Sequence, residues 1–247
     1  MDRLIYVAMS AANHTLSQQA TVAHNLANIT TAGFRAETTM FRAVPVTGPG
    51  QPTRTFVIDA TPGADFTPGA IETTGRDLDV AIQGKGWIAV QAADGSEAYT
   101  RAGSLQINNN GLLTTRTGNI VLGDGGPIAV PSDTRLTIAS DGTVSTVPTT
   151  TLLNNSSVTG RIKLVNPPES SLTRGGDGLF RVAGGAAAPA DSNVQLVSGA
   201  LEASNVNPVD GMINMIALAR QFDMQMKMLQ NAESDAQQAA QVLAMPA

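Results

Sequence analysis

Apolar residues follow a helical pattern near both ends of the chain and an alternating pattern between them. In the N-terminal part they recur at alternating steps of three and four, and only Gln19 breaks the series. This spacing predicts a helix over residues 3–28 with one narrow apolar stripe. The stripe consists of Ile5, Met9, Ala12, Leu16, Ala23 and Leu26.

A second series of the same kind runs through the C-terminal part, where Glu233 is the one polar defect. It predicts a helix over residues 208–244, roughly 55 Å long at about 1.5 Å per residue. Asn207 followed by Pro208 suits an N-cap and the first helical position. The series consists of Met212, Met215, Ala219, Phe222, Met226, Leu229, Ala236, Ala240 and Leu243.

Both stripes are too narrow for fully buried helices, so each needs one partner surface. Two such helices bury their stripes against each other or against neighbouring subunits. We therefore expect the terminal helices to pair in a coiled-coil-like layer. Ordinary amphipathic helices packed on a globular core are the alternative.

Between the helices, short alternating segments are separated by glycine-containing turns at 94–95, 110–111, 117–119 and 141–142. This pattern predicts a mainly antiparallel β-domain, whereas the Thr/Ser/Asn-rich range 147–158 predicts an exposed loop. The predicted strands are 80–82, 87–91, 98–101, 104–107, 112–114, 120–122, 128–130, 136–138, 161–165 and 179–182.

The expected fold class is therefore α+β, in four parts. Residues 1–35 form an N-terminal axial helix and turn, and 36–74 an extended connector. Residues 75–200 form the central β-rich domain, and 201–247 the C-terminal axial helix. The connector assignment depends on five prolines and little alternation in that range, and an irregular part of the β-domain is its alternative.

Composition limits the classes of function. The 247 residues are 42% hydrophobic but only 4% aromatic, which predicts a core built from small side chains. A net charge of -5 argues against nucleic-acid binding, and the absence of cysteine excludes disulfides and thiolate ligands. No stretch approaches the roughly 18 consecutive apolar residues of a membrane helix. The first residues lack the pattern of a cleaved secretory signal, so we expect any export to use another route.

Residues that could carry out catalysis or bind metal are sparse. His14 and His24 lie ten positions apart, about 80° off a common helix face, which does not fit a metal pair. Asp77 and Asp79 bracket Leu78 and would point the same way on a strand. Turn capping, or a salt bridge with Arg76 or Arg101, explains them better than acid–base catalysis. No catalytic, cofactor-binding or metal-binding residue is predicted.

Three ordered blocks carry a family resemblance. Residues 24–35 contain an Asn-Leu-Ala-Asn run before a Gly-Phe pair, residues 78–87 and 99–104 form the second block, and residues 204–206 and 215–227 form the third. Together they resemble the bacterial flagellar rod and hook proteins over nearly the whole chain. The departures from the family pattern are His24, Trp87, Pro208, Ala219 and Phe222.

The resemblance implies a non-enzymatic subunit of the flagellar basal-body rod, most like the proximal members, with the distal members as the alternative. Its terminal helices would build a helical tube that transmits torque across the periplasm. The implied partners are copies of the chain, other rod proteins and the flagellar export apparatus, through which it would pass unfolded without a cleaved signal peptide. A trimeric β-rich adhesin or phage-tail-like protein is a second class of function, and a hydrolase using Asp77 or Asp79 a third.

Two residue sets follow. The predicted assembly interface consists of Ile5, Met9, Leu16, Leu26, Met212, Met215, Phe222, Met226 and Leu229. The residues of the family motif are Asn25, Leu26, Asn28, Gly33, Phe34, Ser204, Asn205, Val206 and Arg220. Among these, Asn25, Asn28 and Gly33 are assigned to capping and sharp turning at the helix end. A β-branched residue at position 33 is therefore expected to block assembly more than folding of the β-domain.

Overall fold

The computed structural model describes residues 2–45, 55–131, 134–148 and 156–243. It has an α+β fold with two α-helices, one short 3₁₀ helix (Glu169–Ser171) and mainly antiparallel strands among these residues. The chain forms two compact units. The helical unit comprises Met1–Ala27, Glu37–Asp65 and Val206–Ala247, and the β-unit comprises Asn28–Ala36 and Phe66–Asn205.

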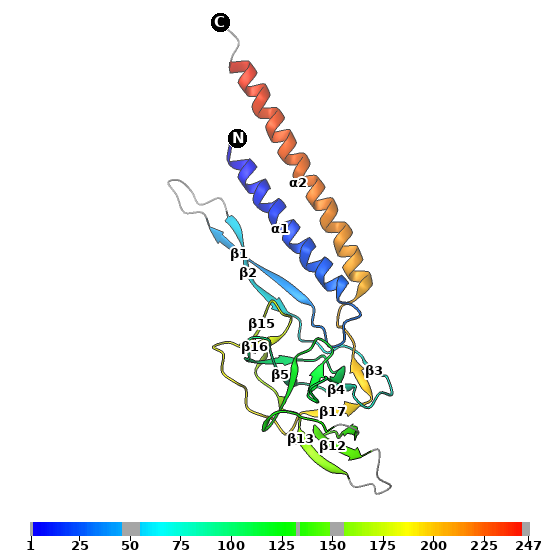
Figure 1. The fold of residues 1–247 in the computed structure, drawn as a ribbon. Helices are drawn as coiled ribbons and strands as arrows, with labels where there is room; N and C mark the ends of the chain where they lie inside the picture. The colour runs from blue at the N-terminus through cyan, green and yellow to red at the C-terminus, as the bar shows by residue number, and fades with distance from the viewer. Residues whose placement is uncertain (1, 46–54, 132–133, 149–155, 244–247) are drawn as a thin grey trace. The chain divides into compact units, whose positions relative to one another are not determined.

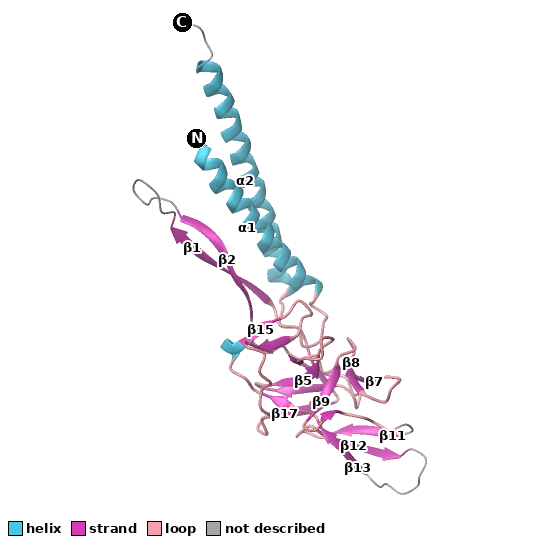
Figure 2. Cartoon of the chain, turned by 60° about the vertical axis from the view of Figure 1, so that its left-hand side comes forward, coloured by secondary structure: helices cyan, strands magenta, loops and turns pink. Residues whose placement is uncertain are grey.

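In the helical unit, helix α1 (Asp2–Ala27) and helix α2 (Pro208–Leu243) lie side by side (Figures 1 and 2). Strands β1 (Glu37–Pro45) and β2 (Thr55–Ala64) form an antiparallel hairpin that packs along α1. The His14 ring on α1 meets the Phe41 ring on β1 edge to face, with 5.5 Å between centroids. Neither described helix combines the length and apolarity needed to cross a membrane.

Residues 36–74 were predicted to form an extended connector, and this prediction needs correction. The range contains the β1–β2 hairpin and also strand β3 (Ile71–Thr73). Prolines concealed the strands in the sequence, because proline lacks the N–H that a central strand needs. Each strand of a two-stranded hairpin has an outer edge without a ladder partner, where proline is tolerated. Pro45 and Pro62 both occur within these strands.

The β-unit is built from short strands, and every strand pair in it is antiparallel. Its largest sheet has the order β15-β16-β6-β5-β9-β8-β7, with β10 beside β9 and β14 beside β5. Smaller sheets are β11-β12-β13, β17-β4 and β18-β3. The strands are β4 (Val80–Gln83), β5 (Trp87–Gln91), β6 (Glu97–Thr100), β7 (Leu105–Ile107), β8 (Leu113–Thr115), β9 (Ile120–Gly123), β10 (Gly126–Pro127), β11 (Thr134–Ile138), β12 (Thr143–Pro148), β13 (Ser157–Arg161), β14 (Leu164–Val165), β15 (Leu172–Arg174), β16 (Phe180–Val182), β17 (Gln195–Ser198) and β18 (Ala200–Glu202).

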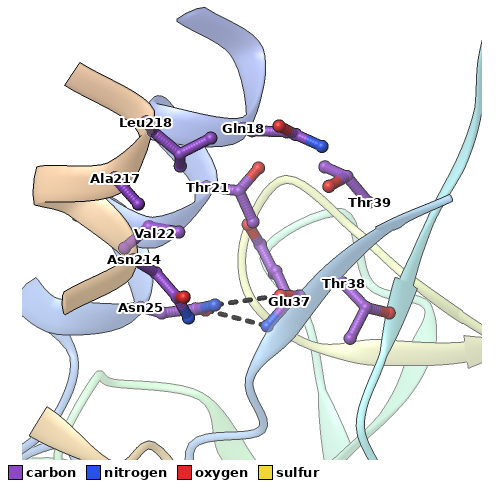
Figure 3. Close-up of a pocket in the computed structure, with 10 residues that line it drawn as sticks. All are labelled: Gln18, Thr21, Val22, Asn25, Glu37, Thr38, Thr39, Asn214, Ala217 and Leu218. Carbon is purple, nitrogen blue, oxygen red and sulfur yellow. Dashed lines mark hydrogen bonds between the residues drawn. The ribbon is translucent and has the colours of Figure 1, made fainter. Parts of the chain in front are cut away.

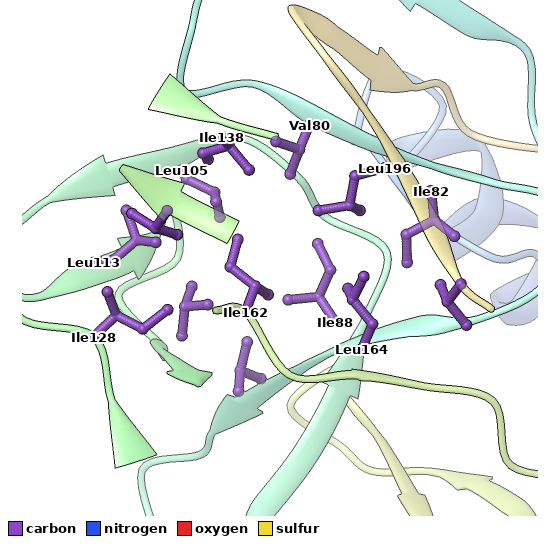
Figure 4. Packing of buried hydrophobic residues seen from close by; sticks show 14 of the residues in the cluster. Val80, Ile82, Ile88, Leu105, Leu113, Ile128, Ile138, Ile162, Leu164 and Leu196 are labelled. Atoms are coloured by element: carbon purple, nitrogen blue, oxygen red, sulfur yellow. The ribbon is translucent and has the colours of Figure 1, made fainter. Parts of the chain in front are cut away.

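The core of the β-unit is made of aliphatic side chains that converge from several sheets (Figure 4). Ile88, Leu105 and Leu113 are completely buried. Strand β12 shows the cause in its sequence, because Val144 and Thr146 alternate with more exposed neighbours. The low aromatic content predicted such a core of small side chains.

One predicted strand and one predicted loop need correction. Residues 128–130 do not form a strand of their own, and only Ala129 makes an isolated bridge, to Leu112. The predicted loop 147–158 has its first residues on β12 and its last on β13, while 149–155 lie outside the described residues. Threonine is β-branched and suits strands as well as loops, so composition misled the prediction there. The turn glycines were predicted correctly: Gly95, Gly111, Gly118 and Gly142 all have positive φ.

Candidate functional site

Small and polar residues occupy the most buried positions on α1 and α2. Ala8, Ala12 and Thr15 are buried on α1, and Gln225 and Ala232 on α2. The Thr15 hydroxyl donates to Gln225 Oε1 at 3.1 Å and also lies 3.0 Å from the carbonyl oxygen of Ala11. Small and polar side chains therefore occupy the most buried positions of this contact, and none of the large apolar residues of either helix is as buried among the described residues.

Large apolar side chains cover a different face of α2. Val209, Met212, Ile213 and Ile216 are between 55% and 61% exposed. Their spacing of three and four residues places them in one stripe of the helix. We call these four residues the outer stripe of α2.

The predicted assembly residues fall into two groups. Met9, Leu16, Met212 and Met226 are exposed, between 38% and 55%. The other described members, Leu26, Met215, Phe222 and Leu229, are half-buried. Phe222 and Leu229 lie three residues before and four after Gln225, which places them on the side of α2 that faces α1. Ile5 lies on α1, but its side chain is outside the described part of the structure.

Asn25 joins the last turns of α1 to the start of β1. Its side-chain amide donates to the Glu37 carbonyl at 2.9 Å, and its Oδ1 accepts from the Glu37 N–H at 2.8 Å (Figure 3). The His24 ring lies 3.0 Å from the Glu37 carboxylate. Asn25 was predicted to cap the helix end, but it instead hydrogen-bonds the first residue of the hairpin.

An open groove of about 410 Å³ lies beside this pair, between α1, α2 and the start of β1 (Figure 3). Amide and hydroxyl side chains line most of it, including Gln18, Thr21 and Asn214. Among the described residues it brings together no group of His, Asp or Glu suited to hold a metal ion.

The turn after α1 belongs to the β-unit. The Thr31 N–H donates to the Asn28 carbonyl and its hydroxyl to Asn28 Oδ1, so Asn28 does stabilise the turn. Gly33 has φ +69°, as its assignment to the sharp turn requires. Its N–H donates to the Glu202 carbonyl at 2.7 Å. A Cβ at Gly33 would come within 2.2 Å of the Arg101 carbonyl group, so glycine is required for space as well as for φ.

Phe34 is buried in the β-unit beneath an arginine. The Arg174 guanidinium lies 4.6 Å from the centroid of the Phe34 ring and donates to the Arg35 carbonyl at 2.8 Å. Phe180 continues the stack, since its ring centroid lies 5.9 Å from Arg174 and 4.7 Å from the Trp87 ring. The aromatic residue of the motif is therefore an anchor within the β-unit.

Arg35, Arg101 and Glu202 form a buried ionic cluster, exposed by 1%, 5% and 1% respectively. Arg101 Nη1 donates to Glu202 Oε2 at 2.8 Å. Arg35 Nη2 lies 2.7 Å from Glu202 Oε1 without meeting hydrogen-bond geometry, so this contact is an ion pair. Burial lowers the pKa of the Arg101 guanidinium, and the Glu202 carboxylate opposes that shift.

Further hydrogen bonds join three segments of the β-unit around this cluster. Asn205 Oδ1 accepts from the Ala36 N–H at 2.7 Å, and its amide donates to the Thr67 carbonyl at 3.1 Å. Arg35 Nη1 donates to the same carbonyl at 2.6 Å, and the Gly69 N–H donates to Glu202 Oε1 at 3.0 Å. Residues 28–36, 66–69 and 202–205 are the segments at which the β-unit continues into the rest of the chain. We call this set of contacts the junction cluster.

The start of α2 is capped as predicted. Asn207 Oδ1 accepts from the Val209 N–H at 3.0 Å, and its amide donates to Asp210 at 2.8 Å. The remaining motif residues are less informative. Ser204 and Val206 are half-buried, and Arg220 is exposed on α2.

The acidic pair considered for catalysis is structural. Asp79 is buried and pairs with Arg76 at 3.1 Å, as expected. Asp77 is exposed and pairs with Arg135 at 2.7 Å. The two carboxylates therefore have separate cationic partners and do not form an acid–base pair.

Sequence reasoning missed the roles of Arg35, Arg101, Arg174 and Glu202. Charged residues in a sequence are usually solvated, and nothing in their spacing indicates burial. The one signal that could have indicated a structural role was their position relative to the family blocks. Arg35 is the last residue of the first block, and Glu202 lies two residues before the third.

Comparisons with known proteins define the class. Residues 5–35 match the family model for flagella basal body rod proteins, and residues 81–146 match that for the FlgE/F/G D1 domain of the flagellar hook protein. Residues 197–242 match the C-terminal model of the FlgEFG basal-body rod proteins. The class is therefore that of the flagellar rod and hook proteins.

Individual relatives narrow this class. The flagellar basal-body rod protein FlgF of Escherichia coli K12 is 50% identical, with 99% of this chain and 100% of the relative covered. FlgF of Salmonella typhimurium is 48% identical with the same coverage, and the rod protein FlgG of Bacillus subtilis is 30% identical over 94% of this chain and 96% of its own length. The chain belongs to the FlgF family of flagellar basal-body rod proteins, as a structural subunit and not an enzyme. This membership removes the adhesin and hydrolase alternatives.

Proposed function

We propose that the chain assembles through α1 and α2 with copies of itself and with other rod proteins into a helical tube. The tube would be the proximal part of the rod and would transmit torque across the periplasm. The observation that carries the proposal is the outer stripe of α2, four large apolar side chains that the chain itself leaves more than half exposed. Exposed apolar patches of this kind mark protein interfaces.

The geometry of α2 separates the outer stripe from the contact with α1. Ile216 and Gln225 are nine residues apart, or about 900° of helical rotation, so they point in opposite directions. Gln225 faces α1, where it bonds Thr15. Packing of the two helices within one chain therefore leaves the outer stripe available to a neighbouring subunit.

Helix α1 supports the same proposal. Met9 and Leu16 are seven residues apart on one side of the helix and are 48% and 46% exposed. Ala8 and Thr15 have the same spacing on the buried side. Repeats of seven on both sides suit a coiled-coil-like layer in which each helix contacts more than one partner. In this proposal Met9, Leu16, Met212 and Met226 are contacts between subunits, whereas Leu26, Met215, Phe222 and Leu229 act chiefly within the chain.

Delivery to the rod is part of the proposal. We infer that the chain passes through the flagellar export apparatus in an unfolded form and without a cleaved signal peptide. The absence of cysteine supports this route, because folding after export then needs no disulfide formation. Imaging intact basal bodies with a tagged subunit tests the proximal position along the axis.

A paired substitution tests the assembly surface. We expect Ile213→Ser with Ile216→Ser to change the stability of the isolated chain by less than about 1 kcal/mol, since both side chains are already exposed. The same variant should fail to enter basal bodies and should abolish swimming in cells that lack their own copy. Val158→Ser is the matched control, because Val158 is 70% exposed on β13 in the β-unit. Normal motility of the double variant would contradict the proposal.

A further inference from the structure

Glu202 contacts three parts of the β-unit that precede it in the chain. These are residues 28–36, residues 66–69 and Arg101. Its main-chain carbonyl accepts from Gly33, and its Oε1 accepts from the Gly69 N–H. Its two carboxylate oxygens contact Arg35 and Arg101. Residues 28–36, which we call the signature segment, thus meet a side chain that lies late in the sequence.

We propose that docking of the signature segment onto the remainder of the β-unit, residues 66–205, is conditional on Glu202, so that the C-terminal strand β18 must be in place before the segment can dock. This order of folding applies within one chain. Docking in this order requires no neighbouring subunit.

The charge balance of the buried ionic cluster of Arg35, Arg101 and Glu202 supports this proposal first. Arg35 and Arg101 are both at least nine-tenths buried, and they share the single carboxylate of Glu202. Without that carboxylate, docking would bury two positive charges beside each other, and an uncompensated buried charge is strongly unfavourable. Burial is the main cause that lowers the pKa of the Arg101 guanidinium, and the neighbouring positive charge of Arg35 acts in the same direction.

The remaining hydrogen-bonding groups are the second argument. Apart from Glu202, the hydrogen-bond acceptors of the two guanidinium groups among the described residues are main-chain carbonyls, that of Thr67 for Arg35 and that of Gly84 for Arg101. The Arg101 guanidinium also lies 5.5 Å from the centroid of the Trp87 ring, which is uncharged and cannot replace a carboxylate. The Nε atoms of both arginines have no hydrogen-bond partner among the described residues. No second carboxylate in the described residues pairs with either arginine, so none substitutes for Glu202.

The position of Glu202 is the third argument. Glu202 is the last residue of β18, which pairs with β3 through Glu202 and Ile71. Its carboxylate reaches the cluster only when this pair has formed. Arg35, in contrast, occurs near the start of the chain, before any strand of the β-unit. The signature segment therefore stays undocked until the end of the β-unit has folded.

Trypsin reports docking directly, because Arg35 is itself a cleavage site that is 1% exposed when docked. In the full-length chain, we expect Glu202→Gln to raise the rate of cleavage after Arg35 by about tenfold or more, since a buried charge pair is broken. Mass spectrometry identifies this cut by the fragment that begins at Ala36. Hydrogen exchange of the Ala89 amide, bonded to Lys163 within the β-unit, should remain slow.

Glu169→Gln is the matched control. Glu169 pairs with Lys85, and the two side chains are 48% and 79% exposed, so the same substitution there should leave cleavage after Arg35 unchanged. Protection of Arg35 in Glu202→Gln at the wild-type level would overturn the proposal. Loss of Ala89 protection in that variant would also overturn it, because docking would then not be separable from folding of the β-unit.

A rescue experiment distinguishes charge from shape. Arg35→Met added to Glu202→Gln removes one of the two unpaired charges, although it also removes further contacts. We expect exchange of the Gly33 amide to be slower in the double variant than in Glu202→Gln alone. If Arg35→Met and Glu202→Gln each speed up exchange of the Gly33 amide and their effects add in the double variant, the charge of Glu202 is not what holds the segment, and the proposal is wrong.

Discussion

The α-carbon of Gly33 lies against the main chain of Arg101, with no room for a side chain between them. An ideal Cβ at position 33 would lie 2.2 Å from both the carbonyl carbon and the carbonyl oxygen of Arg101. Gly33 also has φ +69°, which residues with a side chain rarely adopt. The end of α1 is thus followed by a turn whose conformation and close packing both require glycine.

Substituting Gly33 and Gly75 separates these two requirements. Gly75 has φ +72°, but a Cβ there would meet nothing within 4 Å. We expect Gly75→Ala to cost about 1 kcal/mol of unfolding free energy for backbone strain alone. Gly33→Ala should cost about 2 kcal/mol more, because the segment must also move away from Arg101. Urea unfolding of both variants measures the difference, and equal costs would show that the close approach is relieved without penalty.

Arg174 should not tolerate replacement by lysine. The change keeps the charge but loses the planar group that covers Phe34 and bonds the Arg35 carbonyl. We expect Arg174→Lys to lower the unfolding free energy by about 1 to 2 kcal/mol. Arg135→Lys, at a side chain 69% exposed, should change it by less than about 0.5 kcal/mol. Similar effects at the two sites in denaturant unfolding would argue against a role for the stacked guanidinium.

The Thr15–Gln225 hydrogen bond should couple the two helices. In a double-mutant cycle, Thr15→Val and Gln225→Met are expected to show a coupling energy of about 1 kcal/mol, since each removes one partner of a buried contact. Thermal unfolding followed by helical circular dichroism provides the measurement.

Thr21 supplies the control for this cycle. Its hydroxyl bonds the Ser17 carbonyl of its own helix, so Thr21→Val should add independently to Gln225→Met. If Thr21→Val showed a coupling energy with Gln225→Met as large as that of Thr15→Val, the coupling would reflect destabilisation of α1 as a whole and not the Thr15–Gln225 hydrogen bond.

Tyr99 should make the β-unit sensitive to alkaline pH. Burial raises the pKa of Tyr99 to about 12, and its hydroxyl donates to Glu97 while accepting from the Ala188 N–H. The folded state therefore holds this proton more tightly than the unfolded state, whose tyrosine pKa is about 10. The resulting stability is present below about pH 10 and is lost as pH rises toward 12.

Tyr99→Phe tests this linkage. The variant should be less stable than the wild type at pH 8, because the Ala188 N–H and Glu97 lose a partner. Between about pH 10 and 12, however, its stability should fall less steeply than that of the wild type. Denaturant unfolding at a series of pH values makes the comparison, and parallel slopes would exclude Tyr99 as the source.

The register of the helix contact was beyond sequence analysis. On α2, the predicted series joined Met212 and Met226 to Phe222 and Leu229, but the first two are exposed and the last two half-buried. Apolar residues occur on several sides of this helix, so periodicity alone does not select the side that packs on α1. Gln225, a polar residue, is one of the most buried positions of α2, because Thr15 lies opposite it.

The sequence by itself determined the features that depend on near neighbours in the chain: the helical periodicity at both ends, the cap at Asn207, the positive φ of the turn glycines and the alternation of most strands. Each of these follows from steric and hydrogen-bonding rules within a few residues. Only the tertiary structure decided which charged residues are buried. Arg35, Arg101 and Glu202 resemble ordinary solvated residues until segments far apart in sequence come together, because burial is a property of the packed chain and not of local spacing.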